Sequence, residues 1–460
     1  MIKIVIPNVC LEEQNYILGI LLGEFLGLSF QVETHEHDVI EITLLSLDKK
    51  LTLDTSFFQL ANDAWLSTKA MPKLPLMEWL PEDDGIDASL VTKKLPVLYG
   101  KPGIVKKNKH WHLNIDIFGS SFFMLSRYEE LVSLERDSHE RFPAWASIAD
   151  KAGFLERPIV NEYLEVLWEC MSTLWPFLQR KNRNAKNFIT CDVDWPFNPA
   201  YYFFKPMIRV LAIKIIKEYA LVSAIKVFSK FCLNKLGVKI EDEFRENISW
   251  MMDVNEQAGN KVAFYFIAHN TSSLDTVESI DSLRMRSLLK EIVSRGHEVG
   301  VHPGYETFNN AVNFDESVSN LNKILIEEGI QQQKIGGRQH YLRWNIATTP
   351  NLWEKNNLEY DSTLSFADKA GFRCGVCYEF TMYDLLNRKP LKLKQRPLSV
   401  MECTVISSRY EGLGYSEESL ARFNLFKEYT NMFNGTFTFL WHNNFFEHKK
   451  AKEFYIELIQ

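Results

Sequence analysis

From residue 187 to the C-terminus, the sequence alternates between short apolar segments typical of strands and longer segments whose apolar residues recur with helical spacing. Strands are predicted at residues 187–192, 262–267, 298–302, 334–343, 358–364, 398–405 and 436–442. Helices are predicted between most of them, including residues 243–257, 279–294, 316–328 and 416–433. Strand and helix repeated this often indicate an α/β fold with a largely parallel sheet and right-handed crossovers. About seven repeats favour a closed or nearly closed barrel.

The first 185 residues lack this regular alternation. Strands are predicted at residues 40–45 and 110–117, and helices at residues 118–134 and 159–174. Residues 181–186 are polar and basic, as expected of a linker. We therefore predict two domains: an α+β domain of unknown role over residues 1–185, and a barrel over residues 186–460.

Composition narrows the classes of function. Of the 460 residues, 46% are hydrophobic and 24% are charged, as in ordinary globular proteins. The net charge of −7 argues against a general nucleic-acid binder. The seven cysteines are odd in number and scattered, which indicates a reducing compartment rather than a disulfide framework. Without a recognisable export leader or an apolar run of spanning length, a cytoplasmic location is expected.

Two aspartates end the first predicted strand of the second domain. Asp192 and Asp194 are separated by one residue, so on a strand both side chains project to the same face. They stand at the strand's carboxyl end, where parallel α/β folds build their active sites. Two adjacent carboxylates repel each other unless a cation or a proton lies between them. The alternative is a structural turn in which Asp194 caps a helix.

A second polar cluster follows the strand predicted at residues 298–302. His302 ends this strand and Glu306 follows four residues later, a spacing that can bring both side chains to one ion on a helical turn or tight loop. Imidazole and carboxylate ligands suit Zn²⁺ and other divalent first-row ions. Together with Asp194 they would give three protein ligands and leave a position for water, as in catalytic zinc sites.

Two later strands also end in polar side chains. Residues 337–343 include Arg338, and His442 follows an apolar run near the C-terminus. Taken alone, His442 has the alternative interpretation of a buried core histidine. Four such strand ends in one half of the chain favour a shared site.

The order of these segments resembles the polysaccharide deacetylase family, also called the NodB-homology family or carbohydrate esterase family 4. The likeness is carried by the Asp-x-Asp pair and by three later segments, residues 296–302, 338–341 and 440–443. It covers about residues 187–460 and does not extend to the first domain. The resemblance implies that the second domain is a distorted (β/α)7 barrel of NodB type.

The resemblance also implies roles at a metal centre. Asp194 and His302 would be metal ligands, and Glu306 stands where the family usually has histidine. The ion would be Zn²⁺, with Co²⁺ or Ni²⁺ as alternatives. Asp192 would be the general base, and Arg338 would hold its carboxylate ionised.

The remaining roles concern the leaving group and the sugar. His442 would be the general acid, oriented by Asp361 or Glu402, and the sequence does not choose between these two. A backbone N–H near Tyr341 would stabilise the oxyanion. Three aromatic rings would stack on the sugar or else pack within the barrel: Trp195, Tyr341 and Trp441.

The implied activity is metal-dependent hydrolysis of an N-acetyl group on a sugar of a bacterial surface polysaccharide or its precursor. One alternative is a catalytically decayed carbohydrate-binding protein, motivated by Glu306. Another is a hydrolase of a different C–N bond, such as that of a cyclic amide.

A basic helical segment lies early in the second domain. Residues 203–236 contain seven Lys or Arg residues against Glu218 alone, with apolar residues filling the gaps. Such a segment can lie on an anionic membrane surface, which would place the protein at the inner face of the membrane. The alternative is a pair of helices packed on the barrel with a solvated basic face.

Overall fold

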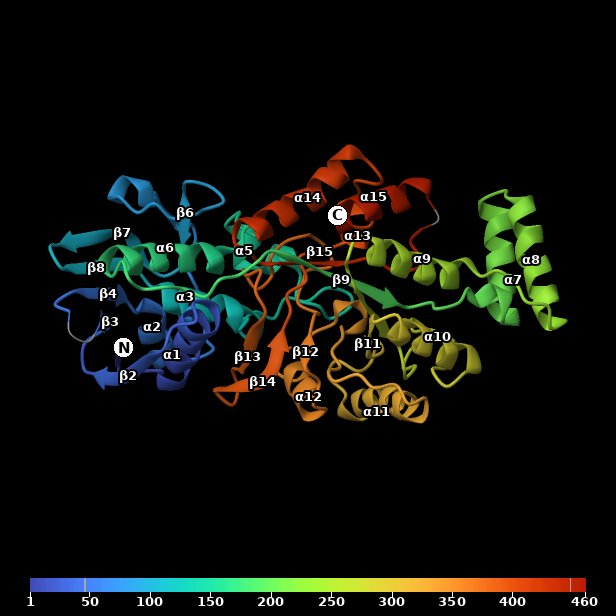
Figure 1. Cartoon of the computed structure of the whole chain (residues 1–460), viewed down its shortest axis with the longest axis horizontal. Coiled ribbons are helices and arrows are strands. Elements are labelled where there is room, and N and C mark those ends of the chain that lie inside the picture. The colour runs from blue at the N-terminus through green and yellow to red at the C-terminus, as the bar shows by residue number, and fades with distance from the viewer. Residues whose placement is uncertain (45–46, 447) are drawn as a thin grey trace. The chain divides into compact units, whose positions relative to one another are not determined.

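Figure 1 shows the computed structural model, which describes residues 1–44, 47–446 and 448–460. The chain forms two compact units. Unit 1 contains Met1–Asn187 and Tyr341–Phe439, and unit 2 contains Phe188–His340 and Leu440–Gln460. Helices and strands alternate through the chain, so the predicted mixed α/β class is confirmed. The division into domains at residues 185 and 186 stays a prediction.

Unit 1 is built on a mixed six-stranded sheet of order β2-β1-β3-β4-β8-β7. The pairs β1–β2 and β4–β8 are parallel, whereas β1–β3, β3–β4 and β7–β8 are antiparallel. The strands are β1 (Ile2–Pro7), β2 (Phe30–His35), β3 (Val39–Leu44), β4 (Lys50–Asp54), β7 (Gly100–Lys107) and β8 (His110–Ile115). The strands predicted at 40–45 and 110–117 correspond to β3 and β8, except that residue 45 lies outside the described residues.

A buried aspartate joins this sheet to its helices. Asp116 follows β8 and caps α3 (Ile117–Leu125): its Oδ1 accepts a hydrogen bond from the Gly119 N–H at 2.7 Å. Its Oδ2 accepts a second one from the Phe57 N–H at 2.8 Å, which ties α2 (Ser56–Asp63) to the same point. Burial raises the pKa of Asp116 to about 8.

The helix predicted at residues 118–134 is interrupted, because Arg127 has a φ of 55° and α4 begins after it at Tyr128. The helix predicted at 159–174 is found as α6 (Ile159–Leu174).

The C-terminal part of unit 1 contains shorter strands than the sequence predicts. A three-stranded sheet of order β12-β14-β13 is followed by helices α13 and α14. The elements of this part of the chain are α12 (Thr349–Lys355), β12 (Tyr360–Asp361), β13 (Phe380–Asp384), β14 (Lys389–Gln395), β15 (Val400–Met401), α13 (Glu402–Ile406), α14 (Glu417–Met432) and β16 (Thr436–Leu440). The segment predicted as a strand at 398–405 therefore contains only the two-residue β15, and its last four residues belong to α13.

Unit 2 contains three parallel strands with β10 between β9 and β11. Its elements are β9 (Lys186–Val193), α7 (Phe204–Ala212), α8 (Leu221–Lys235), α9 (Glu243–Gln257), β10 (Val262–Phe266), α10 (Leu283–Ser294), β11 (Glu298–Val301), α11 (Ala311–Glu327) and α15 (Lys449–Ile459). All five residues of β10 are buried, as expected of a central parallel strand. None of the helices in the described ranges combines the length and the apolar content needed to cross a bilayer.

The predicted closed barrel is not confirmed. In the segment predicted as a strand at residues 334–343, the structure records an isolated bridge between Val301 and Gly337, followed by a 3₁₀ turn. Tyr341 and Leu342 have φ angles of 61° and 54°, and this left-handed backbone cannot continue a strand. The predicted strand ends here because the chain turns.

Asp242 caps helix α9 in unit 2, and the contribution of this cap to stability can be tested. Its carboxylate accepts hydrogen bonds from Phe244 and Arg245 at the start of α9 and from the Asn198 N–H at 3.0 Å. We expect Asp242→Ala to lower the free energy of unfolding by about 1–2 kcal/mol, measured by urea denaturation, because a helix cap is lost. Asp63→Ala, an exposed change at the end of α2, should stay within about 0.5 kcal/mol. Equal effects of the two changes would contradict this role.

Candidate active site

The carboxyl ends of the parallel strands in unit 2 bring the predicted site residues together. Asp192 lies near the end of β9, opposite Tyr265 of β10, and Asp194 follows this strand. His302 directly follows β11, and its N–H donates to Phe266 O at 2.8 Å. Side chains that are about 110 residues apart in sequence therefore meet at one edge of the sheet.

The segment after Gly336 is held beside β11. The Arg338 N–H donates to Val301 O at 3.1 Å, and the His340 N–H donates to Pro303 O at 3.1 Å. This pairing carries His340 to the same edge as His302, and the two imidazole rings lie 4.9 Å apart.

Asp194, His302 and His340 form a group able to hold a metal ion. One donor atom from each lies within 4.8 Å of the others. The Nε2 atoms of His302 and His340 lie 3.3 and 3.6 Å from Asp194 Oδ1. Two imidazole nitrogens and one carboxylate oxygen are a typical donor set for catalytic Zn²⁺, which leaves a fourth position open.

Hydrogen bonds fix the tautomer of both histidines. His302 Nδ1 lies 2.6 Å from Arg338 O, and a carbonyl can only accept, so Nδ1 carries the proton. His340 Nδ1 lies 2.7 Å from Asp275 Oδ1, which gives the same result. With Nδ1 engaged in this way, each ring turns its Nε2 toward Asp194, which is the arrangement of metal-ligating histidines.

Two of the three donor atoms lack other partners. His302 Nε2 and Asp194 Oδ1 are buried and have no hydrogen-bond partner among the described residues. Buried polar atoms without partners are costly, so each such atom requires an explanation. A divalent cation would satisfy both atoms, and the residues present therefore fit a metal site.

The structure does not bring Glu306 into this group. The segment from His302 to Glu306 is not helical, so the spacing of four residues does not place both side chains on one face. Glu306 is exposed, and its backbone N–H donates to Thr271 Oγ1 at 2.9 Å. His340, which sequence reasoning noticed only as part of a motif, takes the third position instead. The signal that could have found it is a histidine two residues after Arg338, at the end of a predicted strand.

Asp192, the first aspartate of the Asp192/Asp194 pair, is held by Arg338. Arg338 Nη1 donates to Asp192 Oδ1 at 2.7 Å and to Thr190 Oγ1 at 2.9 Å, and both Arg338 and Asp192 are buried. Asp192 Oδ2 lies 3.9 Å from His302 Nε2. The predicted contact between Arg338 and Asp192 is therefore present, and the free side of the carboxylate faces the donor group.

His442 reaches the site from the C-terminal segment. The Trp441 N–H donates to Thr190 O at 3.1 Å, and the Asn443 side chain donates to Trp195 O at 2.9 Å. These two anchors place His442 Nε2 at 3.8 Å from Asp194 Oδ2, with a small part of the ring exposed. An imidazole beside the donor group and open to solvent can exchange protons with a bound substrate.

The local charges favour a cation. Burial alone would raise the pKa of Asp194, but His340, His302 and His442 together outweigh it and hold that pKa well below the usual value. Burial lowers the pKa of His302, but Asp192 and Asp194 outweigh it, so the net pKa is raised. Two carboxylates beside the Nε2 atoms of these rings form a field that attracts a positive ion.

Two predicted residues lie in unit 1. Asp361 is buried in β12 and accepts a hydrogen bond from the Thr363 N–H at 2.8 Å, whereas Glu402 is buried at the start of α13. Their predicted role of orienting His442 stays a prediction. Tyr341 also belongs to unit 1, where its ring lies 5.0 Å from that of His139, and its predicted part in substrate binding stays a prediction as well.

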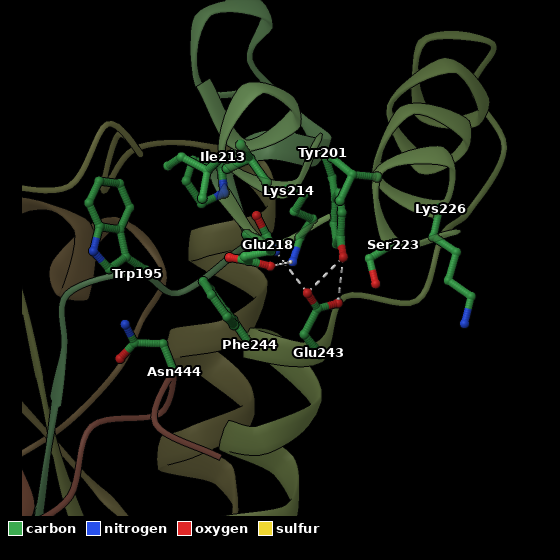
Figure 2. A pocket seen from close by; sticks show the side chains of 14 residues that line it. Trp195, Tyr201, Ile213, Lys214, Glu218, Ser223, Lys226, Glu243, Phe244 and Asn444 are labelled. Atoms are coloured by element: carbon green, nitrogen blue, oxygen red, sulfur yellow. Dashed lines mark hydrogen bonds and ion pairs between the residues drawn. The ribbon is translucent and has the colours of Figure 1, made fainter. Parts of the chain in front are cut away.

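The two tryptophans differ in their access to a ligand. Trp441 is fully buried, stacked on Phe446 at 5.5 Å and edge-on to Tyr455 at 5.8 Å, so its ring is core packing and is not open to a sugar. Trp195 instead lines a pocket of about 550 Å³. Figure 2 shows Trp195 and Asn444 on one side of this pocket, with Tyr201 and Glu243 at its centre. Trp195 directly follows Asp194 in the chain, whereas none of the three donor-group residues lines this pocket.

Comparisons with known proteins match different parts of the chain. A family model described as a family of unknown function (DUF7033) matches residues 2–176. No curated protein matches the chain. The solved structures that are similar to it include a putative polysaccharide deacetylase from Mycobacterium smegmatis, with 15% identity over 62% of this chain and 86% of that one, at a TM-score of 0.37.

A probable polysaccharide deacetylase from Pseudomonas aeruginosa PAO1 is similar with 10% identity over 68% of this chain and 90% of that one, at a TM-score of 0.37. A structure described as Puue allantoinase is similar with 11% identity over 46% of this chain and 65% of that one, at a TM-score of 0.31. Similarity at these identities and TM-scores does not assign an activity to this chain.

Metal-binding measurements distinguish His340 from Glu306 as the third ligand. We expect the purified protein to bind one Co²⁺ or Zn²⁺ per chain, and His340→Ala to weaken this by at least about 100-fold, since loss of even an outer partner costs about 10–100-fold. Glu306→Ala should leave the affinity unchanged. Titration with Co²⁺, followed by its visible absorption, measures both. A loss in Glu306→Ala with retention in His340→Ala would reverse the assignment.

A second test of the metal site changes Asp275, which orients the ring of His340. Asp275→Asn removes the carboxylate that accepts from His340 Nδ1, so metal affinity should fall by about 10–100-fold. Asp281→Asn, an exposed change in the following loop, is the control and should bind metal as the unaltered chain does. Equal affinities in the two variants would show that the His340–Asp275 contact does not support a metal site.

Proposed function

We propose that this protein is a metal-dependent hydrolase that removes the N-acetyl group from a sugar. The observation that carries the proposal is the donor group Asp194, His302 and His340, with Asp192 on one side and His442 on the other. This grouping supports a site in which a metal, a general base and a general acid act together, as hydrolysis of an amide requires. The choice of a sugar amide rests on the likeness of the sequence segments to polysaccharide deacetylases.

The residues of the site have different roles in the proposed reaction. A divalent cation held by Asp194, His302 and His340 would supply Lewis acidity, which lowers the pKa of water from about 16 to about 7 and stabilises an oxyanion. Asp192 accepts the proton of the attacking water, and Arg338 orients this carboxylate through its hydrogen bond.

The second half of the reaction needs an acid. As the C–N bond breaks, the departing nitrogen requires a proton, and the His442 imidazolium supplies it. The products are acetate and a free amine on the sugar. His442 lies on the Oδ2 side of Asp194, whereas both ligand histidines lie nearest Oδ1, so the acid and the ligands do not compete for the same oxygen.

The geometry bears on one alternative. A decayed, non-catalytic site is the interpretation motivated by Glu306 in the place of a histidine ligand, and the presence of His340 in the donor group speaks against it. A hydrolase of another C–N bond would use the same groups and differ only in the shape of its substrate, so it is an outcome of the test that follows.

Acetate release from a panel of N-acetylated sugars tests the proposal. We expect Asp192→Asn and His442→Ala each to lower the rate by about 10²–10⁴-fold, because each removes one proton-transfer group. Neither residue belongs to the donor group, so Co²⁺ binding should persist in both variants.

Glu306→Ala is the matched control and should retain the full rate. Full activity in Asp192→Asn would contradict the proposal. Metal binding without acetate release from any sugar, combined with hydrolysis of a cyclic amide, would move the function to the other C–N bond.

A further inference from the structure

Residues 203–240 form a helical hairpin in unit 2. Helix α7, the π-helical turn Ile213–Lys217 and helix α8 make up its two arms, which lie side by side in Figure 1. The arms pack on each other through a small core. Its buried members are Ala200, Tyr201, Met207 and Val227, with Val210, Leu211 and Phe231 packed against them.

A second set of large apolar side chains on each arm is exposed. On the first arm it runs through Phe204, Ile208, Ile215, Ile216 and Tyr219, and on the second through Leu221, Val222, Ile225, Phe228 and Leu236, all of them exposed. Of the 32 exposed large apolar side chains among the described residues, 13 lie between residues 204 and 238. A solvated helix face would not gather so much apolar surface, so the hairpin has an unpartnered apolar face.

The segment that carries this apolar face is strongly basic. Residues 203–240 contain seven lysines and Arg209 against Glu218 alone, a net charge of +7 in a chain whose total is −7. Of these cations, Lys214 pairs with Glu218 and Lys230 with Glu243. The others have no ion pair among the described residues: Lys205, Arg209, Lys217, Lys226, Lys235 and Lys239.

We propose that this hairpin docks on the surface of an anionic lipid bilayer. The exposed Ile, Leu, Val and Phe side chains would enter the boundary between headgroups and acyl chains, as those of interfacial amphipathic helices do. The lysines would reach the lipid phosphates while their methylene stems stay in contact with apolar surface.

The composition of this face favours a bilayer over a protein. The cores of protein interfaces are enriched in aromatic residues, Met and Arg and depleted in Lys. Ten of the 13 exposed apolar side chains of the hairpin are Ile, Leu or Val, and its cations are seven lysines and one arginine. Positive charge on an otherwise acidic chain is complementary to the negative surface of anionic lipid, which attracts basic segments.

The hairpin adjoins the candidate active site along the chain. It begins nine residues after Asp194, and the 550 Å³ pocket is lined by Trp195 and Asn444 together with Lys214 and Lys226 of the hairpin. Figure 2 shows these four side chains around the pocket. Docking would therefore hold the site near the lipid surface. The docking itself does not depend on the proposed function.

Vesicle flotation of the full chain tests the proposal. The protein should float with vesicles of phosphatidylcholine that contain phosphatidylglycerol, and should do so less with phosphatidylcholine alone and as salt rises. Lys217→Glu/Lys226→Glu should weaken binding by at least about 25-fold, because each cation near an anionic surface contributes about fivefold. Ile216→Asp/Val222→Asp, at positions 69% and 68% exposed, should also abolish flotation.

The matched control is Leu283→Asp/Ile326→Asp, which changes side chains that are 87% and 78% exposed on α10 and α11. It should float as the unaltered chain does. Failure of the unaltered chain to float, or equal flotation of the hairpin variants, overturns the proposal. So does a dimer in solution that both hairpin variants, but not the control, convert to a monomer, since the face would then bind a second copy.

Discussion

The site depends on the position of one buried arginine. Arg338 pairs with β11 through its backbone N–H, its carbonyl fixes the ring of His302, and its guanidinium holds Asp192. A buried guanidinium is costly unless its charge and its N–H groups are matched, so Arg338 and Asp192 stabilise each other only when both are in place. The same backbone pairing carries His340 to the donor group. One segment therefore orients Asp192 and His302 and brings His340 to the donor group.

The two carboxylates at the end of β9 have different surroundings, and this difference allows different roles. Asp192 is neutralised by Arg338 and is only at the edge of the donor group, with Oδ2 at 3.9 Å from His302 Nε2. Asp194 has histidines on both of its oxygens. The repulsion expected between neighbouring aspartates is thus relieved by a fixed cation on one side, and on the other by groups that would share a metal.

Regular elements with strong periodicity were predictable, and elements that depend on turns were not. The strands expected at 187–192, 262–267 and 298–302 are found as β9, β10 and β11, and the helix expected at 243–257 is found as α9. Local hydrophobic pattern suffices where both faces of a parallel strand are buried. The strand expected at 334–343 failed because left-handed residues such as Tyr341 redirect the chain, and apolar periodicity carries no signal for a positive φ.

The sequence by itself determined that Asp192 and Asp194 share a strand end, and that His302 ends another strand, because side-chain period and strand polarity are local properties. Only the tertiary structure decided the third member of the donor group. Spacing along the chain favoured Glu306, but the loop after His302 is not helical and directs that side chain to solvent. His340 arrives instead through a backbone pairing between distant segments, and such long-range hydrogen bonds leave no periodic trace in the sequence.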